Sequence, residues 1–583
     1  MKTLLKQAML TLASMLWLQL PALATEVATR PLRAAALVKP NLVIAVDDSN
    51  SMFAELLLNT DTGYLWWSPT NGGWDSRGIF PVDITGMNYY AILFPFDGGI
   101  PFKELPPTKQ FAFARSSAYN PIYYNPDVTY APWPFGYYAS TPYSFAAANP
   151  RAARIDMIRN STTVDLTSTV CASNIQLQNG MVVDSGQMRG NNCSYSFPFD
   201  VSYQITATES LQQYLATYWV RQTCTVAMND PSCAYAPDGI ATLKRVEIKN
   251  GATFPSGRTY EAELQNFSNW FQYYRNRRLM LKGALGSTLE RVSGMRVGVL
   301  SLHDFVQPTM YDTDGTDSSS NSRAAIGKVY WYDNTSGTPT RKILKHIGDQ
   351  YSSNTSMIQY ACQRNNTLIA TDGYPNDSSL TPPAYNQSTW GSGAPYATTE
   401  AGTLADLALS YYTLNLRPTL ASGRVPSSDS DKNTNLHMNT YAMSLGARGF
   451  LWPATAVPAV STTPYAWPAA VFGYDSRYGI DELWHATING RGQMYLATNP
   501  TDTANGLEAA FNAMTDQVGV QSAGAAICWP TRSRPAPARS AAPRSGLQPP
   551  SSQHARGATA SSPPSTAASA SRSLPTRPRL HRW

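Results

Sequence analysis

A short run of acidic and hydroxyl residues follows the first compact apolar stretch of the chain. Asp47, Ser49 and Ser51 alternate in the run Asp47-Asp48-Ser49-Asn50-Ser51. Alternate residues of an extended loop can point to the same side. One carboxylate and two hydroxyls are hard oxygen ligands of the kind that suits Mg²⁺. The spacing therefore predicts one loop of a divalent-cation site.

Such a loop cannot complete the site alone, because Mg²⁺ takes about six oxygens in a near-octahedral array. Two later positions offer candidates: Thr338 in a Gly-Thr-Pro run and Asp372 in a Thr-Asp-Gly run. Five residues from three loops would leave room for water and for one outside ligand, such as a carboxylate of a partner protein. Mg²⁺ is the favoured ion, with Mn²⁺ and Ca²⁺ as alternatives. The competing interpretation is an ordinary turn or helix cap, which is what an isolated D-x-S-x-S run usually marks.

The elements that must position these residues alternate between strands and helices. Apolar, β-branched runs predict buried strands over Asn41–Val46, Met295–Leu302, Asn366–Ala370, Leu436–Leu445 and Gln493–Ala497. Helical patterns are predicted over Phe267–Arg291, Thr340–Asp349, Glu400–Leu414, Ile480–Ile488 and Asn505–Gln517. This alternation predicts an α/β fold with a doubly wound, mainly parallel sheet covered on both faces. In such folds, ligands bind at the carboxyl ends of the strands.

A long segment separates the first strand from the first helix. Residues 55–265 are rich in Tyr, Trp, Asn, Pro and Gly and carry few helical patterns, which predicts short strands and turns. The segment is too long for a loop. We therefore expect one domain over residues 39–520, interrupted by a β- and loop-rich insertion at 55–265.

The N-terminus predicts export. Lys2 and Lys6 precede an apolar run from Ala8 to Leu20, and the small residues Ala22 and Ala24 follow. This is the pattern of a secretory signal peptide over residues 1–24. An N-terminal membrane anchor is the alternative, although the apolar run is short for one. No later stretch is apolar enough to span a bilayer, so we expect no transmembrane segment after signal cleavage.

The six cysteines are consistent with a location outside the cytoplasm, where nearby cysteine pairs oxidise to disulfides. Cys171 and Cys193, and likewise Cys224 and Cys233, are candidates for local disulfides, and other pairings stay open. Cys362 directly precedes a predicted strand and could be a free, buried thiol. No cysteine pair shows zinc-site spacing.

The net charge of +6 depends on the C-terminal tail. Residues 529–583 hold nine arginines and no acidic residue, and without them 36 basic residues face 39 acidic ones. The body of the chain thus lacks a basic stripe, which excludes nucleic acid as a predicted partner. The segment 528–583 is rich in Pro, Arg, Ser and Ala and is expected to be disordered. Its abrupt onset resembles translation in a shifted frame, and we hypothesise that it is not native product.

Other candidate motifs are weaker. Asp312, Asp314 and Asp317 resemble a calcium loop without its closing acidic residue, and a solvated turn is favoured. His485 is predicted to be a half-buried packing residue. The chain contains no HExxH, GxSxG or Walker motif. A metal-dependent hydrolase lacks a placed general base, so we predict that the protein is not an enzyme.

Several runs together resemble the N-terminal half of the PilC/PilY family of type IV pilus tip adhesins and assembly factors. The most specific is the Tyr-Asn-Pro-Ile-Tyr-Tyr-Asn-Pro run at 119–126, and the others span residues from about 40 to 515. They comprise the runs at 46–52, 130–133, 337–339, 370–374 with Asn376, 403–406, 481–485 and 489–492.

The resemblance implies a von Willebrand factor A-like domain with a metal-ion-dependent adhesion site. It implies Asp47, Ser49, Ser51, Thr338 and Asp372 as metal ligands. It also implies pilus tip proteins or minor pilins and a host or surface receptor as partners. The expected location is the periplasm, the outer membrane, the pilus tip or the cell surface. The family's C-terminal β-propeller finds no counterpart after residue 528. The alternative is a free-standing secreted A-domain binding protein without a pilus role.

Overall fold

The computed structural model describes residues 38–516, apart from 69–72, 75–87, 97–101, 158–161, 172–180, 182–210, 225–229, 231, 318–319, 334–335, 399, 455 and 474. The predicted signal peptide, Cys193 and the tail after residue 528 lie outside the described residues. What the sequence predicts for them stays a prediction.

A six-stranded sheet with the order β16-β15-β1-β17-β18-β19 organises the α/β part of the chain. The central strand β1 runs parallel to β15 and β17, and the parallel order continues through β18 to β19. The edge strand β16 is antiparallel to β15. The strands are β1 (Asn41–Val46), β15 (Arg296–Ser301), β16 (Tyr311–Asp312), β17 (Asn365–Thr371), β18 (Met438–Leu445) and β19 (Arg491–Ala497). The sheet is thus mainly parallel, as the alternation of elements predicts.

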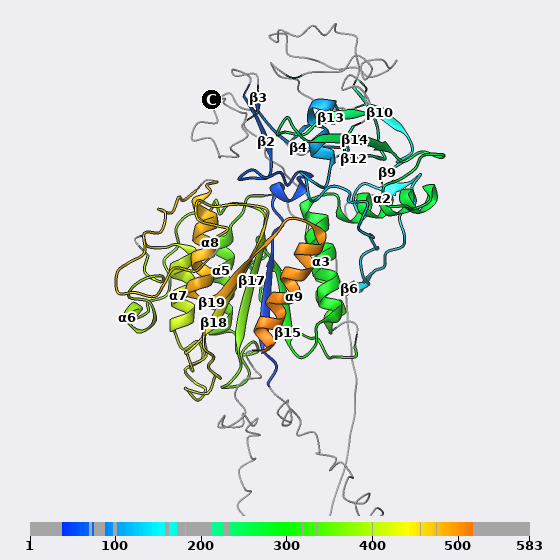
Figure 1. The fold of residues 1–583 in the computed structure, drawn as a ribbon. Coiled ribbons are helices and arrows are strands. Elements are labelled where there is room, and N and C mark those ends of the chain that lie inside the picture. Colours follow the sequence, from blue (N-terminus) through cyan, green and yellow to red (C-terminus); the bar gives the residue numbers. More distant parts are fainter. Residues whose placement is uncertain are drawn as a thin grey trace, which may run out of the picture. The chain divides into compact units, whose positions relative to one another are not determined.

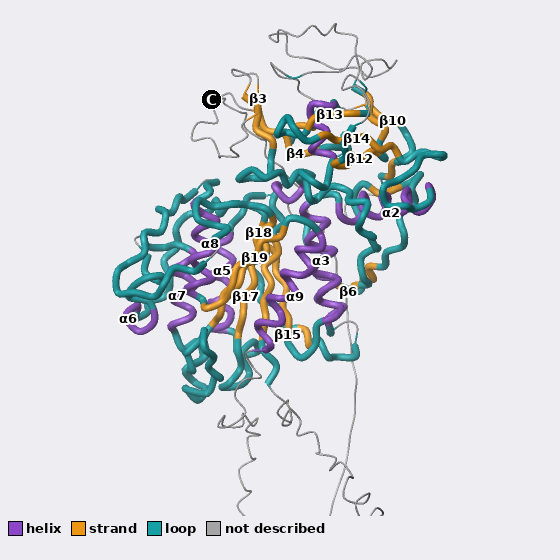
Figure 2. The backbone as a smooth tube through the Cα atoms, in the orientation of Figure 1, coloured by secondary structure: helices purple, strands orange, loops and turns teal. Residues whose placement is uncertain are grey.

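Helices cover both faces of this sheet, as Figures 1 and 2 show. The α3, α4 and α9 helices lie on one face, and α5, α7 and α8 lie on the other. Their bounds are α3 (Arg277–Arg291), α4 (Ser322–Trp331), α5 (Thr340–Ser353), α7 (Leu404–Thr413), α8 (Tyr478–Asn489) and α9 (Pro500–Asp516), and the short α6 (Gln387–Trp390) precedes α7.

After Asn41 the sequence of β1 is apolar, because each face of the strand meets one of these helix layers. Ile44 and its same-side neighbours pack in a cluster with side chains of α3, α4 and α9. Val43 and Ala45 pack in a second cluster with side chains of α5, α7 and α8. All six residues of β1 are buried. A strand buried on both faces needs a continuous apolar run rather than an alternating one.

The predicted helix over Phe267–Arg291 is wrong in one respect, because the structure divides it into α2 (Tyr260–Tyr274) and α3. Asn276 has extended backbone angles, and its side chain accepts a hydrogen bond from the amide of Leu279 at 2.9 Å. Asn276 is therefore the N-cap of α3. Asn is neutral or unfavourable within a helix and favourable at a cap, so its place inside the helical pattern was the available signal.

The α4 helix was not predicted from the sequence. The side chain of Asn321 accepts from the amide of Arg323 at 2.9 Å and caps the helix. A capping residue followed by Ala324, Ala325 and Ile326 was the available signal.

The insertion between β1 and α3 consists of small sheets, as its composition predicts. One has the order β3-β2-β4-β5, another has the order β12-β14-β13, and β6–β7, β8–β9 and β10–β11 are two-stranded. The strands are β2 (Leu65–Ser68), β3 (Gly73–Trp74), β4 (Asn88–Ile92), β5 (Lys103–Glu104), β6 (Gly136–Tyr138), β7 (Thr141–Tyr143), β8 (Ala153–Arg154), β9 (Thr163–Val164), β10 (Thr169–Cys171), β11 (Gln212–Tyr214), β12 (Thr217–Arg221), β13 (Cys233–Tyr235) and β14 (Thr242–Glu247). Short 3₁₀ helices lie at η1 (Asn50–Phe53) and η2 (Lys109–Arg115).

The run at 119–126 forms part of the aromatic core of this insertion. The ring of Tyr124 lies 5.1 Å from that of Phe267 on α2, between ring centroids. The hydroxyl of Tyr123 donates to the carbonyl of Thr217 at 2.7 Å. The side chain of Asn120 is fully buried and accepts from the amide of Leu57 at 2.8 Å. The run therefore joins the start of the insertion to α2.

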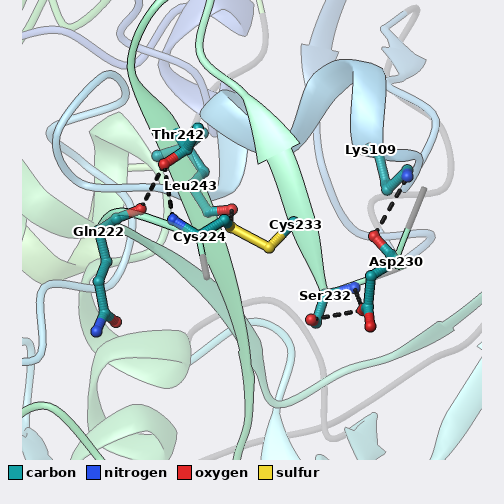
Figure 3. Close-up of a disulfide and its surroundings, with 8 residues drawn as sticks. All are labelled: Lys109, Gln222, Cys224, Asp230, Ser232, Cys233, Thr242 and Leu243. Atoms are coloured by element: carbon teal, nitrogen blue, oxygen red, sulfur yellow. Dashed lines mark hydrogen bonds between the residues drawn. A yellow bond between two sulfur atoms is a disulfide. The ribbon is translucent and has the colours of Figure 1, made fainter. Parts of the chain in front are cut away.

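Cys224 and Cys233 form a disulfide across the edge of the three-stranded sheet (Figure 3). This is the pairing that their separation of nine residues predicts. Cys171 is also disulfide-bonded. The prediction of a free thiol at Cys362 is wrong, because this residue is disulfide-bonded too. Cys362 lies before β17 in a half-buried turn rather than in the strand itself, so it is not enclosed by the core.

Two glycines allow the insertion to touch α4. A Cβ atom at Gly327 would lie 2.5 Å from the backbone carbon of Tyr137, and one at Gly136 would lie 2.7 Å from the amide nitrogen of Gly327. Backbone atoms cannot move aside as a flexible side chain can. The hairpin β6–β7 and α4 therefore pack backbone to backbone.

We predict that Gly327→Ala lowers the free energy of unfolding by about 1–3 kcal/mol, the usual cost of overpacking. The matched control is Gly506→Ala in α9, where the nearest atom is the terminal methyl of Met443 at 2.9 Å. That side chain can shift, and alanine favours a helix, so the control should lose nothing. Urea unfolding of the mature chain measures both variants. Equal losses would contradict the close approach.

Candidate functional site

The register of the sheet brings two of the predicted ligand loops together. Val46 ends β1 and pairs with Ala370 of β17, and the amide of Asp47 donates to the carbonyl of Ala370 at 3.0 Å. Asp47 and Asp372 thus follow neighbouring strand ends at the carboxyl edge of the sheet. Both side chains are buried, with Asp47 1% and Asp372 2% exposed.

Hydrogen bonds fix the shape of the first loop. The amide of Ser49 donates to Oδ1 of Asp47 at 2.7 Å, and the hydroxyl of Thr371 donates to Oδ2. The hydroxyl oxygens of Ser49 and Ser51 lie 2.9 Å apart. The alternating pattern therefore places both hydroxyls on one side, as the sequence predicts.

Three direct contacts tie the three loops to one another. The first joins the loops after β1 and β17, the second joins the first loop to the segment before α5, and the third joins that segment to the loop after β17. In the first, Ser51 Oγ donates to Asp372 Oδ1 at 2.7 Å. In the second, the amide of Asn50 donates to the carbonyl of Ser336 at 3.1 Å. In the third, the amide of Thr338 donates to Oδ1 of Asn376 at 2.8 Å.

Gly373 marks the point at which the loops converge. A Cβ atom there would lie 3.1 Å from Oγ1 of Thr338 and 3.3 Å from Oγ of Ser51. Two hydroxyls from different loops are therefore close to one point beside Asp372. Ser51 stays half-buried while the other predicted ligands are buried, so the cluster reaches the surface beside Ser51.

Two buried carboxylates share this small volume. Burial raises the pKa of Asp47, and the negative charge of Asp372 raises it further, although hydrogen bonds from Ser49 and Thr371 act in the opposite direction. A like charge nearby disfavours the ionised form of Asp47. A cation held between the loops would favour the ionised form of Asp47.

The donor chemistry fits a hard divalent cation. Within the part of the chain that the structure describes, no three His, Cys, Asp or Glu side chains group so as to hold a metal ion. The five predicted residues differ from such a group, because two carry carboxylates and three offer hydroxyls. An all-oxygen set without nitrogen or sulfur suits Mg²⁺, Mn²⁺ or Ca²⁺.

Sequence reasoning missed Arg277, which contacts this cluster from α3. Its Nη1 donates to Oδ2 of Asp372 at 2.7 Å, and its side chain is 1% exposed. Asp372 is thus shared between Arg277 and Ser51, one on each carboxylate oxygen. The available signal was the crowding of Arg275, Arg277 and Arg278 inside an otherwise apolar helical pattern.

Asp48, between two predicted ligands, points elsewhere. Its Oδ1 lies 2.7 Å from Nδ1 of His303, which follows the end of β15. This hydrogen bond raises the pKa of His303 above its ordinary value. The pair joins the first loop to the neighbouring strand end, a link that the scattered histidines of the sequence did not predict.

A buried ion pair between Arg341 and Glu482 lies next to the Thr338 loop. Arg341 begins α5 beside that loop and is fully buried. Its Nε donates to Oε1 of Glu482 at 2.8 Å, and its Nη1 donates to the carbonyl of Asp377 at 2.6 Å. Oε1 of Glu482 also accepts from the amide of Leu404 at 2.6 Å. One ion pair therefore connects two ligand loops to α7 and α8.

The neighbouring Asp481 holds the loop that follows β18. Its carboxylate accepts from three consecutive backbone amides, those of Phe450, Leu451 and Trp452, at 2.7, 2.9 and 2.9 Å. Within the run at 481–485, which carried part of the family resemblance, Asp481 thus holds the backbone of a loop and does not contact the predicted ligands in the bonds described.

The calcium-loop alternative is not favoured by the contacts of its carboxylates. Lys39 pairs with Asp312 at 2.5 Å and with Asp314 at 2.8 Å. Asp314 also accepts from the amide of Gly294 at 2.7 Å. The carboxylates of Asp312 and Asp314 are therefore already engaged by Lys39 and by a backbone amide.

Comparisons with known proteins point to type IV pili. No family model matches the chain. It is 27% identical over 308 residues to the type IV pilus biogenesis factor PilY1 of Pseudomonas aeruginosa strain UCBPP-PA14, and 25% identical over 310 residues to that of strain PAK. The matches cover 43% and 44% of this chain but 25% and 26% of those proteins. The chain therefore spans about a quarter of the curated relatives that it matches, and the similarity is distant and partial.

A solved structure, the pilus adhesin SpaC from Lactobacillus rhamnosus GG, is 13% identical, with a TM-score of 0.20 over 41% of this chain and 27% of that one. A TM-score this low supports no argument. None of the described helices is both long and apolar enough to cross a membrane.

His485 is buried rather than half-buried as predicted. It is 3% exposed, and its ring stacks on that of Trp467 with centroids 4.0 Å apart. Burial lowers the pKa of His485 to about 3, against the opposing effect of backbone hydrogen bonds with Tyr396 and Pro395. His485 is thus a neutral packing residue of α8.

This burial predicts acid sensitivity. Between pH 6 and pH 4 the unfolded chain takes up a proton on His485 that the folded chain does not, so stability falls as pH falls, by roughly 1.4 kcal/mol per pH unit. His485→Phe keeps the ring stack and removes this proton. We predict that urea unfolding at pH 6, 5 and 4 gives a shallower pH slope for the variant. Parallel pH curves for the two proteins would contradict a neutral buried His485.

Proposed function

We propose that this chain is a type IV pilus biogenesis factor and adhesin that binds partners through a metal-ion-dependent adhesion site. The observation that carries the proposal is the meeting of side-chain oxygens from three loops at the carboxyl edge of a parallel sheet. The partial similarity to PilY1 proteins supports the pilus role.

The proposed domain is von Willebrand factor A-like and covers residues 39–520, with the insertion at 55–265. Asp47, Ser49, Ser51, Thr338 and Asp372 would hold the cation, with Mg²⁺ favoured over Mn²⁺ and Ca²⁺. A cation at this site would supply electrostatic attraction for an incoming carboxylate. The protein's own residues orient the loops, since the contacts among Ser51, Asp372 and Thr338 hold them in place. The site is proposed to bind without catalysing a reaction.

The proposed partners are pilus tip proteins or minor pilins, together with a host or surface receptor. This requires export, which the proposed signal peptide over residues 1–24 would provide. The location would then be the periplasm, the outer membrane, the pilus tip or the cell surface. A free-standing secreted A-domain binding protein without a pilus role is the second candidate.

We predict that Asp47→Ala abolishes binding of Mg²⁺ and Mn²⁺, because it removes one of two carboxylates from the ligand set. Isothermal titration calorimetry of the mature chain with each chloride salt measures the affinity. The control is Asp429→Ala, which removes a fully exposed carboxylate paired with Lys432 on another loop. Unchanged affinity in Asp47→Ala would refute the ligand set.

The pilus role is tested by deleting the gene in its host. We predict fewer surface pili and smaller twitching zones, restored by the intact gene but not by Asp47→Ala. Counting pili by electron microscopy gives the result. Normal piliation in the deletion strain would refute the pilus role and favour the free-standing alternative.

A further inference from the structure

Arg277 places a fixed positive charge against the proposed ligand set. Its guanidinium donates to Oδ2 of Asp372, whereas Oδ1 of the same carboxylate faces Ser51. A cation would therefore approach Asp372 from the side of Oδ1, away from Arg277. Arg277 and Asp372 are both buried, so solvent screens their charges little.

The guanidinium is held on its other sides as well. Its Nη2 donates to the carbonyl of Leu56 at 2.8 Å and to that of Thr62 at 2.7 Å. The ring of Tyr64 lies 4.9 Å from its central carbon. The backbone amide of Arg277 donates to the carbonyl of Ala54 at 3.1 Å. These contacts keep the charge where it is, so it cannot swing away when the occupancy of the site changes.

The charge balance of the site follows from these positions. Asp47 and Asp372 contribute two negative charges, and Arg277 offsets one of them. A divalent cation among these groups would keep one net positive charge, whereas without Arg277 the two carboxylates would neutralise it. The repulsion between Arg277 and the cation acts through buried protein, where it exceeds its value in water.

We infer that Arg277 is a built-in counter-charge that weakens cation binding and leaves the bound cation attractive to a carboxylate of the partner. The inference rests on the proposed function, because it concerns the same site. Arg277 is a positioning and affinity-setting residue, since it touches a proposed ligand and not the cation itself.

The test compares two buried arginines two positions apart. Arg277→Gln should raise the affinity for Mg²⁺ and for Mn²⁺ at least about tenfold, because it removes one unit of charge repulsion. Arg275→Gln is the matched control, since Arg275 is equally buried and pairs with Glu55 at 3.0 Å, away from the ligand loops. It should lose folding stability while its cation affinity stays at the wild-type value. Calorimetry with each chloride salt gives the affinities, and circular dichroism verifies folding.

Arg277→Met provides a second neutral variant if the glutamine variant does not fold, because its apolar stem can keep contact with Tyr64. An affinity that is unchanged or weaker in the folded neutral variant would overturn the inference while leaving the proposed site intact. The same gain in Arg275→Gln would also overturn it, since the effect would then not depend on Asp372. If the wild-type chain binds no cation, both the proposed function and this inference are refuted.

Discussion

The junction between α2 and α3 depends on a row of buried arginines, and much of the described structure meets there. Arg275 pairs with Glu55 where the chain enters the insertion, and Arg277 pairs with Asp372 at the sheet edge. Arg278 pairs with Asp156 in the insertion and with Asp333 beyond α4. One short segment thus joins the insertion, the ligand loops and the helix layer. The helical path breaks at Asn276, and the arginines on either side of it reach different partners.

Buried ion pairs of this kind specify an arrangement more than they stabilise it. Removing two charges from water costs several kcal/mol per ion, which their attraction only partly offsets. Breaking one pair, however, leaves a buried charge without compensation. Glu55 shows how far the compensation extends, because its second oxygen accepts from the amides of Leu93 and Phe94 at 2.6 and 3.0 Å. A shifted insertion would leave such groups unsatisfied, so these pairs select one placement of the insertion on the sheet.

The parallel strands of the main sheet followed from the sequence because a strand buried on both faces needs an uninterrupted apolar run, as in residues 42–46 of β1. Their order in the sheet, and the edge strand β16, were not predicted. The meeting of Asp47 with Asp372 followed from the rule that parallel strands end at one edge. Arg277 could not be predicted in the same way, because its pairing spans 95 positions in sequence and depends on how α3 packs. The two-helix division at Asn276 was missed since apolar periodicity continues across it. The disulfide at Cys362 was missed because proximity to a strand was taken as burial within it.

The ligand loops are held by protein contacts that do not need a cation. Asn376 binds the Thr338 loop, Ser51 binds Asp372, and Arg341 with Glu482 fastens the start of α5 to α8. Structural metal sites are different, because there the metal provides the folding free energy. If the proposed cation binds, a preorganised oxygen cluster would leave more of its attraction for an outside ligand. This arrangement is consistent with the proposed reversible adhesion, in which the fold would persist while partners bind and leave.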